Sequence, residues 1–219
     1  MKLSLRVVPV LAVTLVPWLL VAQQGEKLIA TMAENARVLH QYTFKQRSDI
    51  KYKGEDKVII TVQVRFDQDG KRQVMPISQT GGQEATGLGR RIINRKRAEM
   101  KEYVDRVAAL VESYLPPEPE KLRSALLKAE IGQAGSLMSL TMKNYFKAGD
   151  SLALTVDPAT RRLSRIELKT DLDKDPISVT AELTPLAGAG NVSYPGLTKI
   201  KVPVKNLEID ISQYDYMKL

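Results

Sequence analysis

Apolar and polar residues alternate with a period of two through most of the chain, which predicts β-strands. The longest such run covers residues 58–66, where Val58, Ile60, Val62, Val64 and Phe66 alternate with polar positions. Shorter runs occupy residues 42–51, 72–78, 137–145, 200–204 and 207–211. The sequence Asp67–Gly70 between two of these runs is typical of a hairpin turn, because Gly tolerates positive φ.

Residues 150–182 carry three apolar runs separated by Asp-Pro sequences at 157–158 and 175–176. Proline fixes φ and Asp bonds to the backbone ahead of it, so both sites indicate turns. Charged residues, among them Arg165, Glu167 and Lys169, alternate with the apolar ones. This pattern predicts an antiparallel meander with one apolar and one charged face.

The period becomes helical in residues 25–40, 90–115 and 119–131. Pro116-Pro117 ends the second helix and Gly132 the third, so residues 90–132 form a predicted αα-hairpin inserted in a β-chain. The sheet has one apolar face that must be covered, and these helices are the only long apolar surfaces available. The pattern therefore predicts an α+β fold.

Two details concern the last strands. The apolar alternation slips in phase at Lys205-Asn206, which predicts a bulge or a tight turn. Residues 214–219 are expected to form the closing edge of the sheet.

The N-terminus has the layout of a secretory signal peptide. Lys2 and Arg6 precede an uncharged, mostly apolar stretch, Val7–Ala22, which is shorter than the about 20 residues of a membrane span. We expect residues 1–22 to be cleaved and residues 23–219 to form one periplasmic domain. An uncleaved signal anchored in the inner membrane is the alternative.

The chemistry available is limited. The chain has no Cys and one His, His40, and no serine lies in a G-x-S-x-G motif. Asp171, Asp173 and Asp175 have the spacing of a calcium loop, but Pro176 stands where the loop needs Gly, so a strand turn is the better interpretation. We expect no catalytic residue, no metal site and no cofactor, with an uncharacterised hydrolase as the weaker alternative.

The chain is basic, with a net charge of +8, of which residues 1–22 supply two charges. Five basic residues gather at the start of the predicted helix at 90–115: Arg90, Arg91, Arg95, Lys96 and Arg97. Positive charge there opposes the helix dipole at a cost of about 0.3–1 kcal/mol each. Either the cluster meets an anion, an acidic partner or an anionic membrane surface, or the helix starts later and the cluster is solvated. Export argues against nucleic acid as the partner. The Gly-rich segment 80–89 lacks a phosphate-binding motif and is expected to be a loop or hinge.

Several short sequence segments resemble those of one protein family. These are Leu28, Met32, Asn35, Ala36 and Leu39 in the first helix, Tyr42-Thr-Phe, and the segments 64–71, 154–160 and 163–168. Together they resemble the periplasmic lipoprotein-carrier superfamily of the LolA and LolB type. The resemblance implies an incomplete antiparallel β-barrel with helices over its mouth and an apolar cavity for acyl chains. Residues 144–216 also resemble uncharacterised exported bacterial proteins. The helical insertion is longer than a carrier lid, and no acyl-handling residue of the carriers is matched, so none is transferred.

We therefore expect a curved antiparallel half-barrel with an N-terminal helix and an inserted αα-hairpin on its concave face. The predicted function is non-catalytic binding of a hydrophobic ligand, either a lipid or an acylated partner such as a lipoprotein. The alternative is an envelope structural or interaction protein with a filled core and a basic patch. The candidate lining residues are Val58, Ile60, Val62, Val64, Leu152, Leu154, Ile166 and Leu168.

Overall fold

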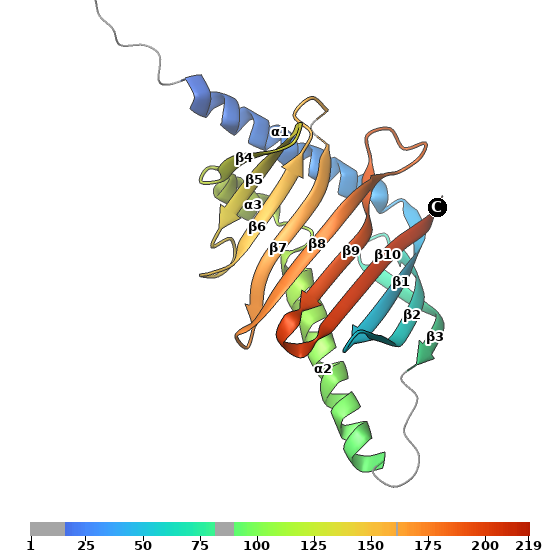
Figure 1. Cartoon of the computed structure of the whole chain (residues 1–219). Coiled ribbons are helices and arrows are strands. Elements are labelled where there is room, and N and C mark those ends of the chain that lie inside the picture. The colour runs from blue at the N-terminus through green and yellow to red at the C-terminus, as the bar shows by residue number, and fades with distance from the viewer. Residues whose placement is uncertain (1–15, 82–89, 161) are drawn as a thin grey trace, which may run out of the picture.

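The strands form one open, curved antiparallel sheet in the order β3-β2-β1-β10-β9-β8-β7-β6-β5-β4 (Figure 1). The computed structural model describes residues 16–81, 90–160 and 162–219. The predicted signal peptide up to residue 15 and the Gly-rich segment from residue 82 lie outside these residues. The strands are β1 (Tyr42–Tyr52), β2 (Glu55–Phe66), β3 (Arg72–Gly81), β4 (Glu130–Ala134), β5 (Leu137–Lys143), β6 (Ser151–Val156), β7 (Leu163–Leu172), β8 (Asp175–Pro185), β9 (Ser193–Val202) and β10 (Leu207–Lys218).

Three helices, α1 (Val16–Leu39), α2 (Arg90–Tyr114) and α3 (Pro119–Leu126), lie behind the sheet in Figure 1, on its concave face. The predicted α+β half-barrel is thereby confirmed. α1 begins at Val16 rather than at residue 25. α3 ends earlier than predicted, because Glu130–Ala134 pairs with β5 as strand β4 and this pairing overrides the local helical pattern. Within the described residues, no helix combines the length and the apolar character needed to cross a membrane.

The prediction of a turn at Lys205-Asn206 is confirmed. A 3-10 turn, Pro203–Lys205, connects β9 to β10, and Asn206 has a φ of 48°. The prediction that residues 214–219 close the sheet at its edge is wrong, because β10 lies between β1 and β9. Ile209 is opposite Ile50 on one side and Ile200 on the other, so the apolar face is continuous only in this order. The edges are β3 and β4.

The meander at 150–182 forms β6, β7 and β8, as predicted, and its apolar face makes the centre of the core. Leu152 is opposite Leu168, and Leu168 is opposite Val179, with all three at most 1% exposed. These side chains belong to one cluster with buried residues of the three helices: Leu28, Ile29, Val107, Val111, Tyr114, Leu122 and Leu126. Burial of this apolar surface is the main force that holds the helices on the sheet.

Polar contacts fix α2 in place at two points along its length. Near its end, the buried Tyr114 hydroxyl donates to Oδ2 of the buried Asp150 at 2.7 Å and lies 3.1 Å from Thr170 Oγ1. Two to three turns earlier, Tyr103 donates to Asp175 at 3.0 Å and Arg106 to Asp173 at 2.6 Å. α2 is therefore positioned by directional bonds as well as by apolar contact.

Candidate functional site: an uncovered apolar surface on β2 and β3

The apolar concave face of the sheet continues from the core onto β1 and β2. Ile50 is opposite the core residue Ile209 on β10 and opposite Val58 on β2. From there, Ile60 and Val62 follow Val58 at alternate positions of β2, so they share its face. Sheet register thus carries the apolar face onto β2 through Ile50 and Val58, while the polar residues Ser48 and Gln46 of β1 lie opposite Ile60 and Val62.

The packed core does not extend across the whole sheet. The core cluster holds residues of the three helices and of β5 to β10, but among the described residues it includes none from β2 or β3. Val58, Ile60 and Val62 are half-buried, and β3 is exposed along its whole length. Val74, opposite Val64, is 46% exposed. We refer to Val58, Ile60, Val62 and Val74 as the β2–β3 apolar surface.

An aromatic cluster borders this surface near the start of β1. The Phe44 ring stacks on Tyr216 with centroids 4.7 Å apart, and Tyr194 lies 4.3 Å from Tyr216 on its other side. Burial raises the pKa of the Tyr216 hydroxyl, which donates to Gln213 Oε1 at 2.6 Å. The hydroxyl therefore stays neutral at physiological pH, and this border is uncharged.

A polar border lies at the start of β3. Arg72 donates to Gln46 Oε1 at 3.0 Å and forms an ion pair with Glu112 of α2 at 3.8 Å. This pair joins β3 to the helix over the concave side. Both side chains are well exposed, so the pair contributes little stability and can be rearranged by a ligand.

The structure divides the eight predicted lining residues into two groups. Leu152, Leu154, Ile166 and Leu168 lie in the filled core under the helices. Val64 is fully buried outside that cluster, and Val58, Ile60 and Val62 lie on the β2–β3 apolar surface. Sequence reasoning missed Val74, although its place in the alternation at 72–78 was a usable signal.

The basic cluster lies at the start of α2, as the prediction of a helix from residue 90 required. Because α2 begins at Arg90, the interpretation in which the helix starts after the cluster is wrong. The Arg90 and Arg91 side chains lie outside the described part. Arg95, Lys96 and Arg97 are all exposed, and Arg95 pairs with Glu99 at 2.9 Å.

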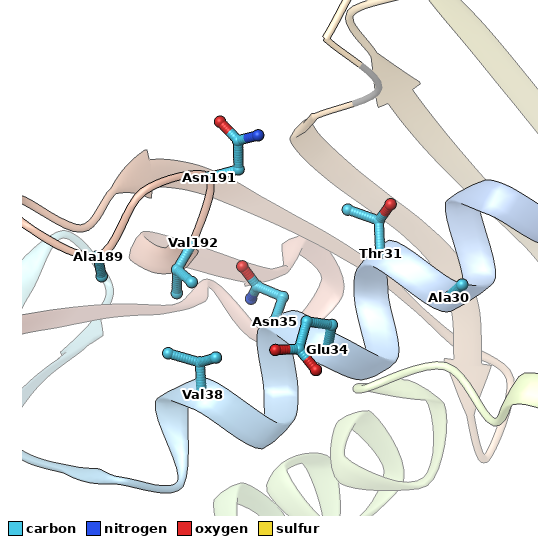
Figure 2. Close-up of a pocket in the computed structure, with 8 residues that line it drawn as sticks. All are labelled: Ala30, Thr31, Glu34, Asn35, Val38, Ala189, Asn191 and Val192. Atoms are coloured by element: carbon cyan, nitrogen blue, oxygen red, sulfur yellow. The ribbon is translucent and has the colours of Figure 1, made fainter.

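A concavity of about 480 Å³ lies elsewhere, between α1 and the loop that precedes β9 (Figure 2). Its walls are formed by Ala30, Thr31, Glu34, Asn35, Val38, Ala189, Asn191 and Val192. Two of its polar groups are already engaged. The Asn35 amide donates to Ser193 O and accepts from Ser193 N, both at 2.6 Å, and Glu34 pairs with Arg37. The two Asn35 bonds attach α1 to β9, so this concavity is a weaker candidate for a ligand site.

The described residues offer little reactive chemistry. No group of three His, Asp or Glu side chains in this part is placed to hold a metal ion. His40 is exposed just after α1, and its ring stacks on Phe66 at 4.1 Å. The carboxylates of Asp171, Asp173 and Asp175 pair with Lys147, Arg106 and Lys205, respectively. The arrangement is suited to binding apolar groups by burial.

Comparison with known proteins gives two distant structural likenesses. One is a DUF1329 family protein from Desulfovibrio piger, with a TM-score of 0.42 and 10% identity over 90% of this chain and 92% of that chain. The other is an outer membrane lipoprotein-sorting protein domain from Vibrio parahaemolyticus, with a TM-score of 0.45 and 9% identity over 90% and 93%. No family model and no curated protein matches the sequence.

Proposed function

We propose that this protein is an exported, non-catalytic binding protein that holds a hydrophobic ligand on the β2–β3 apolar surface. The observation that carries the proposal is the apolar concave face that extends beyond the packed core. Val58, Ile60 and Val62 share a face with Ile50, which packs against the core, yet they are only half-buried. A ligand that covered them would complete the burial that the three helices leave unfinished.

The ligand that fits best is an acyl chain, free or attached to a lipid or a lipoprotein. An acyl chain is long, narrow and uncharged. The apolar side chains at alternate positions of neighbouring strands form a surface of the same kind, which is also long, narrow and uncharged. Burial stabilises by about 0.8 kcal/mol per methylene, so ten buried methylenes contribute about 8 kcal/mol before ordering costs. Micromolar binding requires a net free energy of about 8 kcal/mol. Association itself costs about 4 kcal/mol or more, so ten buried methylenes give binding weaker than micromolar, and a longer buried stretch is needed for micromolar affinity.

The absence of catalysis and the exported location belong to the same proposal. The β2–β3 apolar surface contains only aliphatic side chains, and its borders carry the neutral Tyr216 and the ion-paired Arg72. None of these groups is a nucleophile poised beside a base. The export signal predicted in residues 1–22 supports a location in the envelope, where lipids and lipoproteins are available.

Two substitutions on neighbouring residues of β2 test the proposal. Ile60 lies on the concave face, whereas Ile59 is opposite Asp49 and lies on the convex face; both are half-buried. We expect Ile60→Asn to weaken binding of a fluorescent fatty acid at least tenfold and Ile59→Asn to leave it within twofold. Native mass spectrometry of the unmodified protein should show co-purified lipid that the Ile60→Asn variant lacks.

Equal binding by both variants, or no binding of fatty acid or phospholipid by the unmodified protein, would refute the ligand site. Such a result favours the alternative of an envelope interaction protein, for which the filled half of the core under α1, α2 and α3 is sufficient.

A further inference from the structure

Four turns lie together at one end of the strands. Strand pairing places Lys143, Ser151, Lys169, Ser178, Lys201, Glu208 and Lys51 in a single row across the sheet. The chain turns beyond this row at residues 53–54, 144–150, 173–174 and 203–206. We call these four segments the turn edge. In Figure 1 they lie along the lower side of the sheet, and the first half of α2 projects past them.

Two turns of this edge expose a large apolar side chain that is followed directly by lysine. Val204 is 57% exposed and precedes Lys205 in the turn between β9 and β10. Phe146 is 49% exposed and precedes Lys147 in the turn between β5 and β6, with the Lys121 ammonium 4.0 Å from the centre of its ring. An apolar tip beside a lysine is typical of groups that sit at the boundary between acyl chains and phosphates.

The charge at the turn edge is favourable for an anionic partner. The exposed carboxylate of Asp173 is tied to Arg106, and Asp171 and Asp175 are tied to Lys147 and Lys205. Asp150 is buried beneath Tyr114. Lys53 and Lys174 add two exposed cations at turn tips. Beyond the edge, the described part of α2 carries Arg95, Lys96, Arg97 and Lys101, of which Arg95 pairs with Glu99 and Lys101 with Asp105.

We propose that the turn edge is a membrane-docking surface, which inserts Val204 and Phe146 among the headgroups of an anionic bilayer. Lys53 and Lys174, the exposed lysines at the turn tips, then contact lipid phosphates. Each lysine close to an anionic membrane contributes about 1 kcal/mol, which is about a fivefold change in affinity. Docking in this way goes beyond ligand binding and does not depend on it, because no residue of the β2–β3 apolar surface takes part.

The absence of native cysteine allows a site-specific test in the full-length chain. Single cysteines at Val204→Cys, Phe146→Cys and, as a matched control, Leu219→Cys carry the environment-sensitive dye NBD. Leu219 is also exposed, at 69%, but it follows β10 at the opposite end of the strands from the turn edge. Vesicles of phosphatidylcholine with 30% phosphatidylglycerol should shift the emission of the probes at 204 and 146 to the blue, and leave the probe at 219 unchanged. The N-terminal segment is the same in all three proteins, so it cannot produce the difference.

A charge variant gives a second readout. We expect Lys174→Gln to weaken vesicle binding about fivefold, and Lys71→Gln, in the turn between β2 and β3 at the other edge, to have no effect. Unchanged emission at 204 and 146, or an equal response at 219, would overturn the proposal. Docking onto an acidic protein instead of lipid would give that result, because the vesicles contain no protein. The Ile60→Asn variant should still bind vesicles, so failure of the ligand site and failure of the docking surface are distinguishable.

Discussion

Removal of the Tyr114 hydroxyl tests how α2 is held on the sheet. Tyr114 is 1% exposed and donates to Asp150, which is 3% exposed and accepts two further hydrogen bonds, from the backbone N–H groups of Phe146 and Lys147. A hydrogen bond to a charged group contributes about 1.5–3 kcal/mol. Tyr114→Phe should therefore lower the free energy of unfolding by about 2 kcal/mol. For a chain of this length, that corresponds to a decrease in Tm of about 4–8 °C.

The neighbouring Tyr145 provides a matched control. Its hydroxyl is buried but has no hydrogen-bond partner among the described residues. Removal of an unpaired hydroxyl costs little or stabilises, so Tyr145→Phe should leave the free energy of unfolding within about 0.5 kcal/mol of the parent value or raise it. Urea titration followed by circular dichroism measures both variants. If Tyr145→Phe destabilised as much as Tyr114→Phe, loss of packing rather than loss of the hydrogen bond would be the cause.

A pH series further separates the contribution of the Tyr114 hydrogen bond from that of packing. Burial raises the pKa of Tyr114 to about 12, with Asp150 as a further cause, whereas an unfolded tyrosine titrates near 10. The neutral hydroxyl is therefore favoured by folding. Its contribution is fully present below pH 10 and is lost as the pH rises towards 12. The stability difference between the parent protein and Tyr114→Phe should shrink over this window; a constant difference from pH 9 to 12 would contradict the assignment.

Two further predictions concern other parts of the molecule. Asn35→Ala removes both hydrogen bonds between α1 and Ser193, so the free energy of unfolding should fall by about 2 kcal/mol. The Ser193 amide should also exchange faster with deuterium. Unchanged exchange would show that α1 is held by other contacts. Leu154→Ala should destabilise by about 2–5 kcal/mol because Leu154 is fully buried, whereas Val62→Ala at a half-buried position should cost about 1 kcal/mol; equal losses in urea titrations would contradict the division between filled core and open surface.

Much of the sheet could be predicted from local pattern. The alternation of Leu152, Leu154, Ile166 and Leu168 identified the buried face, because burial on one face of a strand requires a period of two. The phase slip at Asn206 located a turn for the same reason, since a strand cannot change faces without one. These properties depend on neighbours in the sequence and are therefore visible in it.

The order of the strands and the extent of helical cover could not be predicted in this way. The alternation at Val58, Ile60 and Val62 is as regular as that of the core strands, yet the helices leave these positions half-buried. How far α2 reaches is decided by contacts such as those of Tyr103 with Asp175, between residues 72 positions apart. Likewise, nothing local shows that residues 207–218 pair with β1. The candidate site arises from this long-range arrangement, so the sequence predicted its residue types but not its limits.

The central position of β10 has a consequence for how the chain is made. Strands β1, β2 and β3 are completed early in synthesis, yet β1 joins the rest of the sheet only through residues 207–218. Until those residues emerge, β1 presents an unpaired edge beside the uncovered apolar face of Val58 and Ile60. Such an edge is a template for aggregation. The early hairpins therefore remain exposed to aggregation until the end of the chain has been made and pairs with β1.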